Sequence, residues 1–225
     1  MAKTRILLAG GAIAAASFIA APLQAQIGTS QPAPITQDGS NWHFDAAGHR
    51  FTIPFPDWLS AAERLSPDVA SLVEDNYYSD PTQSFVEFFP RGESLKDWTT
   101  TYAARVTLSP GRSLEDYRRA TIFGYSRACQ PDATGVFMFG EQTEDFFPAL
   151  AFICGAYLDT IPELKGKGEV MVSVFRKTDA GIAVIYQEWR GPAFGTYQPE
   201  TWPVTPDVLE ARANELQAEA VLIAN

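Results

Sequence analysis

The side chains that could serve as a nucleophile, a base or a metal ligand are few in this sequence. Its only cysteines are Cys129 and Cys154, and its only histidines are His43 and His49. A thiolate nucleophile needs a base beside it, and a zinc site usually takes three or four protein ligands. Two readings stay open: a histidine that activates a cysteine, and a weak metal site formed by His43, His49 and Asp45. We expect neither, and we predict no catalytic residue, no metal and no cofactor. We also predict that the fold tolerates replacement of both histidines by glutamine.

The two cysteines are spaced for a structural disulfide. Cys129 and Cys154 lie too far apart for a C-x-x-C redox site. An exported chain meets an oxidising compartment, where such a pair tends to close. Closing this loop should stabilise the fold by about 3 to 4 kcal/mol in the loop-entropy model. We therefore predict a bond between Cys129 and Cys154.

The sequence contains no linear motif that identifies an enzyme class. Gly124 to Ala128 is one residue short of the G-x-S-x-G nucleophile elbow, but Ser126 falls in a predicted helix and no histidine follows it. A Walker loop, G-x-G-x-x-G, H-E-x-x-H and S-x-x-K are all absent from the sequence. The alternative to a non-catalytic protein is a hydrolase or lyase that uses carboxylate, Tyr or Ser chemistry without a linear signature.

Acidic and aromatic residues meet inside the loop that the two cysteines would close. The alternating oxygen ligands and the glycine of an EF-hand are absent there, and spacing alone cannot place two carboxylates across a glycosidase cleft. Phe anchors ringed by charge suit the centre of a protein interface. The other reading is a solvated hairpin tip whose rings pack inward. We predict an interaction knob made of four residues: Glu144, Asp145, Phe146 and Phe147.

The start of the chain has the three parts of a bacterial-type export signal. Lys3 and Arg5 supply positive charge, residues 6–21 are uncharged and apolar, and Ala25 is a small residue at the end. The apolar stretch is shorter than the roughly 20 residues that a membrane-spanning helix needs. We therefore favour cleavage between Ala25 and Gln26 over an uncleaved anchor, and a periplasmic or secreted location.

Removal of the signal would leave one acidic domain. The predicted organisation is a signal peptide at 1–25, a flexible linker at 26–40 and a single domain at 41–225. Cleavage reduces Lys plus Arg from 17 to 15 against 27 Asp plus Glu, so the net charge changes from −10 to −12. Such a surface repels phosphate backbones and anionic lipids. We expect no nucleic-acid partner and no membrane span after cleavage; the partner, a protein or small ligand, and the oligomeric state stay open.

Hydrophobic periodicity and capping residues predict an α+β domain. Antiparallel pairing is expected because short loops join consecutive strands, whereas parallel pairing would need crossover helices. Ser94 and Ser113, each followed three residues later by Asp, are typical of helix starts. The expected elements are a hairpin (42–44 and 50–53), helical turns (61–65 and 69–73), a strand (84–89), two helices (94–109 and 113–128), a four-strand meander (135–140, 149–158, 170–175 and 182–189) and a closing helix (205–223).

The order of these elements resembles that of uncharacterised exported bacterial proteins over roughly residues 42–224. Their core looks like the PsbP/Mog1-like α/β/α sandwich, in which binding and assembly are the usual roles. The resemblance implies a cysteine pair placed like Cys129 and Cys154 and offers no catalytic residue to carry over. We therefore expect an exported, non-catalytic α+β protein that binds a protein or ligand in the cell envelope. The resemblance is carried by four runs: Phe51-Thr-Ile-Pro-Phe-Pro-Asp-Trp58, Ser94-Leu-Lys-Asp-Trp98, Gly168-Glu-Val and Tyr186-Gln-Glu-Trp-Arg190.

Overall fold

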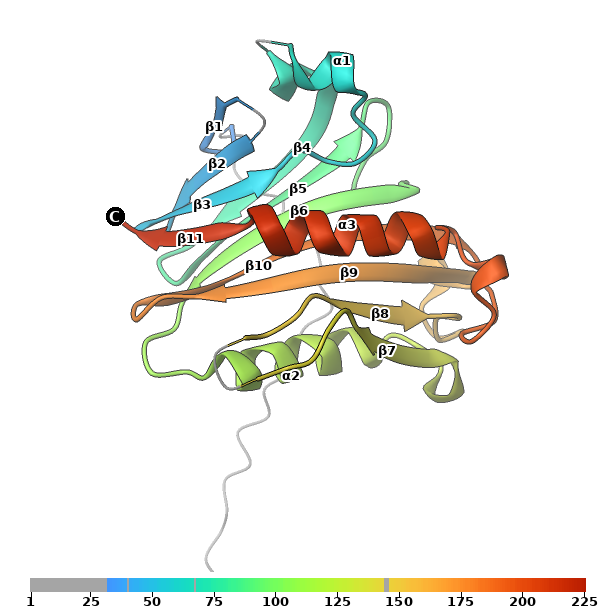
Figure 1. The fold of residues 1–225 in the computed structure, drawn as a ribbon. Helices are drawn as coiled ribbons and strands as arrows, with labels where there is room; N and C mark the ends of the chain where they lie inside the picture. The colour runs from blue at the N-terminus through green and yellow to red at the C-terminus, as the bar shows by residue number, and fades with distance from the viewer. Residues whose placement is uncertain (1–31, 40, 67, 144–145) are drawn as a thin grey trace, which may run out of the picture.

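The computed structural model describes residues 32–39, 41–66, 68–143 and 146–225. These residues form a seven-stranded sheet, a four-stranded sheet and three α-helices (Figure 1). Every strand pair is antiparallel, so the α+β class and the antiparallel pairing are as the sequence predicts. The expected signal peptide and its cleavage point between Ala25 and Gln26 lie outside the described residues.

The seven-stranded sheet contains the meander predicted after Cys129. Its last four strands are neighbours in both sequence and space, each joined to the next without a crossover. The strand order across the sheet is β4 (Val73–Ser79), β5 (Gln83–Pro90), β6 (Thr100–Leu108), β10 (Gly181–Pro192), β9 (Lys167–Lys177), β8 (Leu150–Cys154) and β7 (Thr134–Met138).

The four-stranded sheet grows from the predicted hairpin. Ala47 and Gly48 have φ of 49° and 70°, as a tight two-residue hairpin turn requires. The strand order is β1 (Ile35–Asp38), β2 (Asn41–Ala46), β3 (His49–Pro54) and β11 (Val221–Ala224). β1 lies inside the range predicted as a linker, and β11 replaces the end of the predicted closing helix.

The three helices begin at residues that cap them. Ser60, Ser113 and Thr205 each accept a hydrogen bond from the backbone N–H three residues further on. The helices are α1 (Ala61–Arg64), α2 (Leu114–Ser126) and α3 (Pro206–Glu219), and 3₁₀ turns form at η1 (Val69–Leu72), η2 (Pro131–Ala133), η3 (Pro162–Leu164) and η4 (Pro199–Thr201). Among the described residues, no helix has the length and apolar character to cross a membrane.

The large sheet is buried on both faces. One face packs against α3 and the small sheet, where Val172 and Ile185 join the core. The other packs against α2, where their sequence neighbours Met171 and Val184 lie beside Tyr117. Figure 1 shows α3 (red) and α2 (green) lying along different parts of the sheet.

The predicted helix at 94–109 is wrong, because this segment forms a tight turn followed by β6. Ser94 and Asp97 exchange backbone hydrogen bonds of 3.0 Å in both directions instead of forming a capping box. Tyr102 and Val106 contribute to one core and Ala103 to the other. A strand buried on both faces loses the polar and apolar alternation that marks a strand, so its apolar residues matched helical spacing by coincidence.

Candidate functional site

The cysteines are bonded to each other, which removes them as nucleophiles. Cys129 and Cys154 form a disulfide with a Cα–Cα distance of 5.7 Å. The bond links the segment after α2 to the last residue of β8. Backbone hydrogen bonds between the same segments, Gln130 N–H to Ala156 C=O at 2.9 Å and Leu158 N–H to Ala128 C=O at 2.9 Å, run alongside it. The thiolate reading is therefore wrong.

The two histidines lie in the small sheet and differ in burial and in hydrogen-bond partners. On β2, His43 Nδ1 lies 2.9 Å from Thr52 Oγ1. His49 is 1% exposed, and its Nδ1 donates to Ala47 C=O at 2.8 Å while Nε2 lies 2.8 Å from Thr178 Oγ1. His49 begins β3 and is buried, so the expectation of an ordinary turn residue is wrong. Its ring joins the β2–β3 turn to the β9–β10 turn.

The structure does not assemble the other linear candidates into a reactive centre. Ser126 lies in the last turn of α2, where its hydroxyl donates to Phe123 C=O at 2.9 Å, so its position is that of a helix serine. Asp45, the third residue of the metal site considered from the sequence, is paired with Arg50 at 2.8 Å. In the part of the chain that the structure describes, no three His, Cys, Asp or Glu residues are grouped to hold a metal ion.

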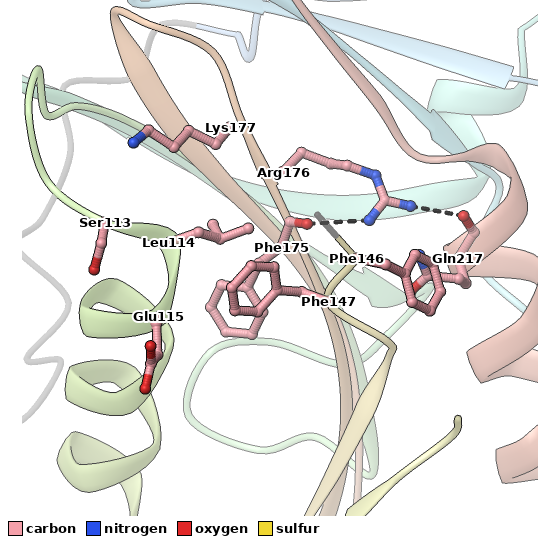
Figure 2. Close-up of a pocket in the computed structure, with 9 residues that line it drawn as sticks. All are labelled: Ser113, Leu114, Glu115, Phe146, Phe147, Phe175, Arg176, Lys177 and Gln217. Atoms are coloured by element: carbon pink, nitrogen blue, oxygen red, sulfur yellow. Dashed lines mark hydrogen bonds between the residues drawn. The ribbon is translucent and has the colours of Figure 1, made fainter. Parts of the chain in front are cut away.

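A pocket of about 650 Å³ opens between α2, α3 and the end of β9 (Figure 2). This volume falls in the range of small-molecule sites, about 300 to 1,000 Å³. Four segments that are distant in sequence supply its walls. The lining residues are Ser113, Leu114 and Glu115 of the α2 start, Phe146 and Phe147 before β8, Phe175, Arg176 and Lys177 of β9, and Gln217 of α3.

Three phenyl rings and Leu114 make the apolar part of this pocket. Phe175 is buried and meets Tyr117 edge to face at 6.2 Å. Phe147 is partly buried, with the Arg118 guanidinium 5.9 Å from its ring centre. Phe146 is 43% exposed. The three rings thus range from buried to exposed. The exposed ring surface is apolar area that a ligand could cover.

Cationic groups lie beside the rings. Arg176 donates to Ala220 C=O at 2.8 Å, Phe175 C=O at 3.0 Å and Gln217 C=O at 2.6 Å. Two of these carbonyls belong to the end of α3, which has no further helical turn to satisfy them. Burial lowers the pKa of Arg176, but an arginine stays charged at neutral pH.

Among the described residues of the lining, two cationic side chains, Arg176 and Lys177, outnumber one acidic side chain. Lys177 is exposed at the end of β9. The start of α2 has the positive end of a helix dipole, with Glu115 and Asp116 in its first turn. Within the part of the lining that the structure describes, the one acidic side chain is Glu115, which is paired with Arg119 at 2.7 Å. The arrangement suits a molecule with an apolar body and an anionic group.

The predicted interaction knob coincides in part with this pocket. Phe146 and Phe147 both line it. Glu144 and Asp145 lie outside the described residues, so the knob as a whole stays a prediction. Sequence reasoning selected these two aromatic residues but missed their neighbours on β9 and α3, because no linear pattern joins segments that meet only in the fold.

Sequence reasoning also missed a buried polar cluster on the α2 face of the sheet. Tyr157 donates a 2.5 Å hydrogen bond to Glu169, and Arg190 reaches the same carboxylate at 2.8 Å. The Arg190 guanidinium stacks 3.5 Å from the centre of the Trp98 ring. The alternation of side chains along a strand could have indicated this cluster. Glu188 and Arg190 are two residues apart on β10 and therefore share a face of the sheet.

Two carboxyl groups of this cluster are shifted toward the protonated form. Burial raises the pKa of Glu188 well above its ordinary value, and the charge of Glu169 adds to the effect. Burial likewise raises the pKa of Glu87, against hydrogen bonding from Asn76. Glu188 Oε1 has no hydrogen-bond partner among the described residues. None of these carboxyl groups lines the pocket of Figure 2.

Comparison of the chain with models of protein families and with curated proteins finds no match. The functional reading therefore rests on the geometry of the pocket and of the buried cluster.

Proposed function

We propose that this chain is an exported, non-catalytic binding protein of the cell envelope, and that its site is the pocket between α2, α3 and β9. The observation that carries the proposal is one cavity whose lining combines three phenyl rings with Arg176 and Lys177. The ligand class is an amphipathic anion, meaning an apolar or aromatic body that carries a carboxylate, sulfonate or phosphate.

The physical argument divides the ligand into two parts. An apolar body covering Phe146 and Phe147 would gain about 25 cal/mol for each Å² removed from water. An anionic group near Lys177 would meet positive charge in a protein whose net charge is −12 once residues 1–25 are removed. A local cationic site on an acidic protein favours small anions over large ones, because the rest of the surface repels extended polyanions.

The same proposal includes export of the protein and a PsbP/Mog1-like fold. The signal-like residues 1–25 and the disulfide both fit an oxidising compartment outside the cytoplasm. Helices packed against an antiparallel sheet support the PsbP/Mog1-like α/β/α sandwich. Mass spectrometry of the exported protein should find Gln26 at its N-terminus, and a retained Met1 would contradict export with cleavage.

A hydrolase or lyase is the second candidate, and the buried cluster is the observation that favours it. Glu188, whose pKa burial raises, lies beside Glu169 and so resembles a general acid next to a second carboxylate. Against this, Glu188 is buried between the sheet and α2 and lies outside the pocket. A substrate would need another route to reach it, so binding is the better supported function.

The binding proposal can be tested with 1-anilinonaphthalene-8-sulfonate, an aromatic anion whose fluorescence rises in apolar sites. We expect saturable binding to the folded protein, and weaker binding of N-phenyl-1-naphthylamine, which has the same rings without the sulfonate. Phe146→Ala should weaken both probes at least several-fold, and Lys177→Gln should weaken only the anion.

Phe123→Ala is the matched control, because Phe123 is 64% exposed on α2 and does not line the pocket. A thermal melt of each variant separates binding to the native pocket from binding to loosened states, which also take up this dye. Equal loss of binding in Phe123→Ala and Phe146→Ala, or no saturable binding at all, would reject the proposal.

A further inference from the structure

The β7 edge of the large sheet presents backbone groups ready for another strand. Among the described residues, β7 has a neighbour on one side only, and Figure 1 shows it at the margin of the sheet. Phe139 N–H donates to Ala149 C=O at 2.9 Å, and Gly155 N–H donates to Ala133 C=O at 2.7 Å. The backbone N–H and C=O groups of the odd-numbered residues therefore point toward β8. Because antiparallel pairing alternates, even-numbered residues direct N–H and C=O away from the sheet. They are Thr134, Val136 and Met138.

The side chains of this edge are apolar and open to solvent. Val136 is 50% exposed, Phe137 39% and Met138 55%. The Phe137 ring lies 6.5 Å from that of Tyr197 and 6.0 Å from that of Trp202, so the apolar surface extends beyond the strand. Exposed apolar groups gathered in this way mark an interaction site on a protein surface.

The two edges of the large sheet differ in charge. β4, at the opposite edge, has exposed acidic residues at Glu74 and Asp75, the usual protection of an edge strand against pairing with another chain. Residues 133–140, by contrast, have no charged side chain. The β7 edge therefore lacks the feature that keeps the β4 edge from pairing.

We propose that the protein forms a symmetric dimer in which β7 of two copies pair antiparallel about a two-fold axis at Val136. This register places Thr134 opposite Met138 of the second copy and Val136 opposite its own equivalent. All outward N–H and C=O groups of these three residues then find partners. Phe137 faces Gly135 of the second copy, so bulky side chains do not meet at that pair. A self-complementary patch of this kind is what a two-fold interface requires.

The expected dimer is weak and depends on salt. A single strand pair with its flanking aromatic residues is small compared with the roughly 1,200 to 2,000 Å² of stable interfaces. Two copies that each carry a net charge of −12 after removal of residues 1–25 repel one another, and Asp132 and Glu141 lie at the two ends of the uncharged segment. Added salt screens this repulsion, so dimerisation should increase with ionic strength.

Sedimentation velocity of the purified exported protein tests the proposal, from about 1 μM to about 1 mM at low and high salt. We expect a reversible dimer that Val136→Lys abolishes, because two ammonium groups would face each other at the axis. Val136→Thr keeps a β-branched, uncharged residue and should stay dimeric. Ile223→Lys, on β11 at the edge of the small sheet, should also stay dimeric, since Ile223 is similarly exposed.

Cross-linking tests the register. Facing residues in a hydrogen-bonded pair have Cα atoms about 5.5 Å apart, within the range of a disulfide. Under mild oxidation Val136→Cys should therefore give a covalent dimer, whereas Met138→Cys should not, because its equivalent lies four residues along the partner strand, about 13 Å away. A monomer at every concentration, equal cross-linking through both positions, or a dimer lost only in Ile223→Lys would overturn the proposal.

Discussion

Arg176 donates a 2.6 Å hydrogen bond to the carbonyl of Gln217, and both residues line the same pocket. The contact ties the end of β9 to the last turn of α3. The guanidinium also binds Ala220 C=O at 2.8 Å, so one side chain closes the end of the helix and shapes the cavity. Pocket geometry and helix stability are therefore linked through Arg176.

Replacing Arg176 should cost stability, whereas replacing its neighbour Lys177 should not. Arg176→Met leaves the carbonyls at the end of α3 without their donor, a loss of about 1 to 3 kcal/mol in the free energy of unfolding. Lys177→Met removes an exposed charge and should change stability by less than about 0.5 kcal/mol. Urea denaturation measures both. Equal stability of the two variants would show that Arg176 does not hold α3 in place.

The disulfide should contribute a large share of the stability. Removing the bond between Cys129 and Cys154 in a Cys129→Ala, Cys154→Ala double variant should lower the free energy of unfolding by about 3 to 4 kcal/mol, through the greater entropy of the unfolded chain. A reducing agent should destabilise the natural protein and leave the double variant unaffected. Two reactive thiols in the denatured, unreduced protein would contradict the bond.

The two histidines should behave differently on substitution. His49→Gln disrupts a buried ring that contacts Ala47 C=O and Thr178, and should cost about 1 to 3 kcal/mol. The ring also packs against Gly181, where an added Cβ would lie 2.8 Å from His49 Cε1. His43→Gln affects a partly exposed strand position and should cost clearly less. Thermal melts of the two single variants test the order, and a larger loss for His43→Gln would reverse it.

The buried carboxyl groups should make stability depend on pH. The pKa of Glu188 is raised in the folded state by burial, so its contribution is fully present below the unfolded pKa of about 4.3 and is lost as pH rises through the folded pKa. Glu188→Gln removes this titration. Relative to the natural protein, the variant should therefore gain stability from pH 4 to pH 8.

Melting temperatures at several pH values provide the measurement. The difference between variant and natural protein is the informative quantity, because the amide also changes the local hydrogen bonding at every pH. Glu115→Gln is the control, since Glu115 is exposed on α2. A constant difference for Glu188→Gln across the range would mean that Glu188 ionises normally in the folded protein.

The sequence predicted the meander, the first hairpin, α2 and α3 because each has a local signal: a turn residue, a cap or a clear period. β6 was mistaken for a helix because both of its faces are buried, so its apolar residues do not alternate with polar ones. The end of the closing helix was missed because Val221 and Ile223 continue its apolar stripe, whereas the chain leaves the helix at Ala220 to pair with β3. Pairing with a strand about 170 residues earlier has no local signature.

The same distinction applies to the candidate site. Phe146 and Phe147 could be selected because aromatic residues next to charges stand out in a sequence. Lys177 and Gln217 could not, because only the packing of α3 along β9 brings them to the same cavity. The buried cluster was hidden for a further reason: Tyr157, Glu169 and Arg190 come from a loop and two strands whose register only the fold defines.

The central claim is that the pocket between α2, α3 and β9 takes an amphipathic anion. The most direct measurement is a titration of isotope-labelled protein with 1-anilinonaphthalene-8-sulfonate, followed by NMR. We predict saturable shifts of the Lys177 and Gln217 amide signals and of the Phe146 ring signals, with the signals of β4 unchanged. Shifts confined to the β7 edge or to the Glu188 cluster, with the pocket signals unmoved, would contradict the account.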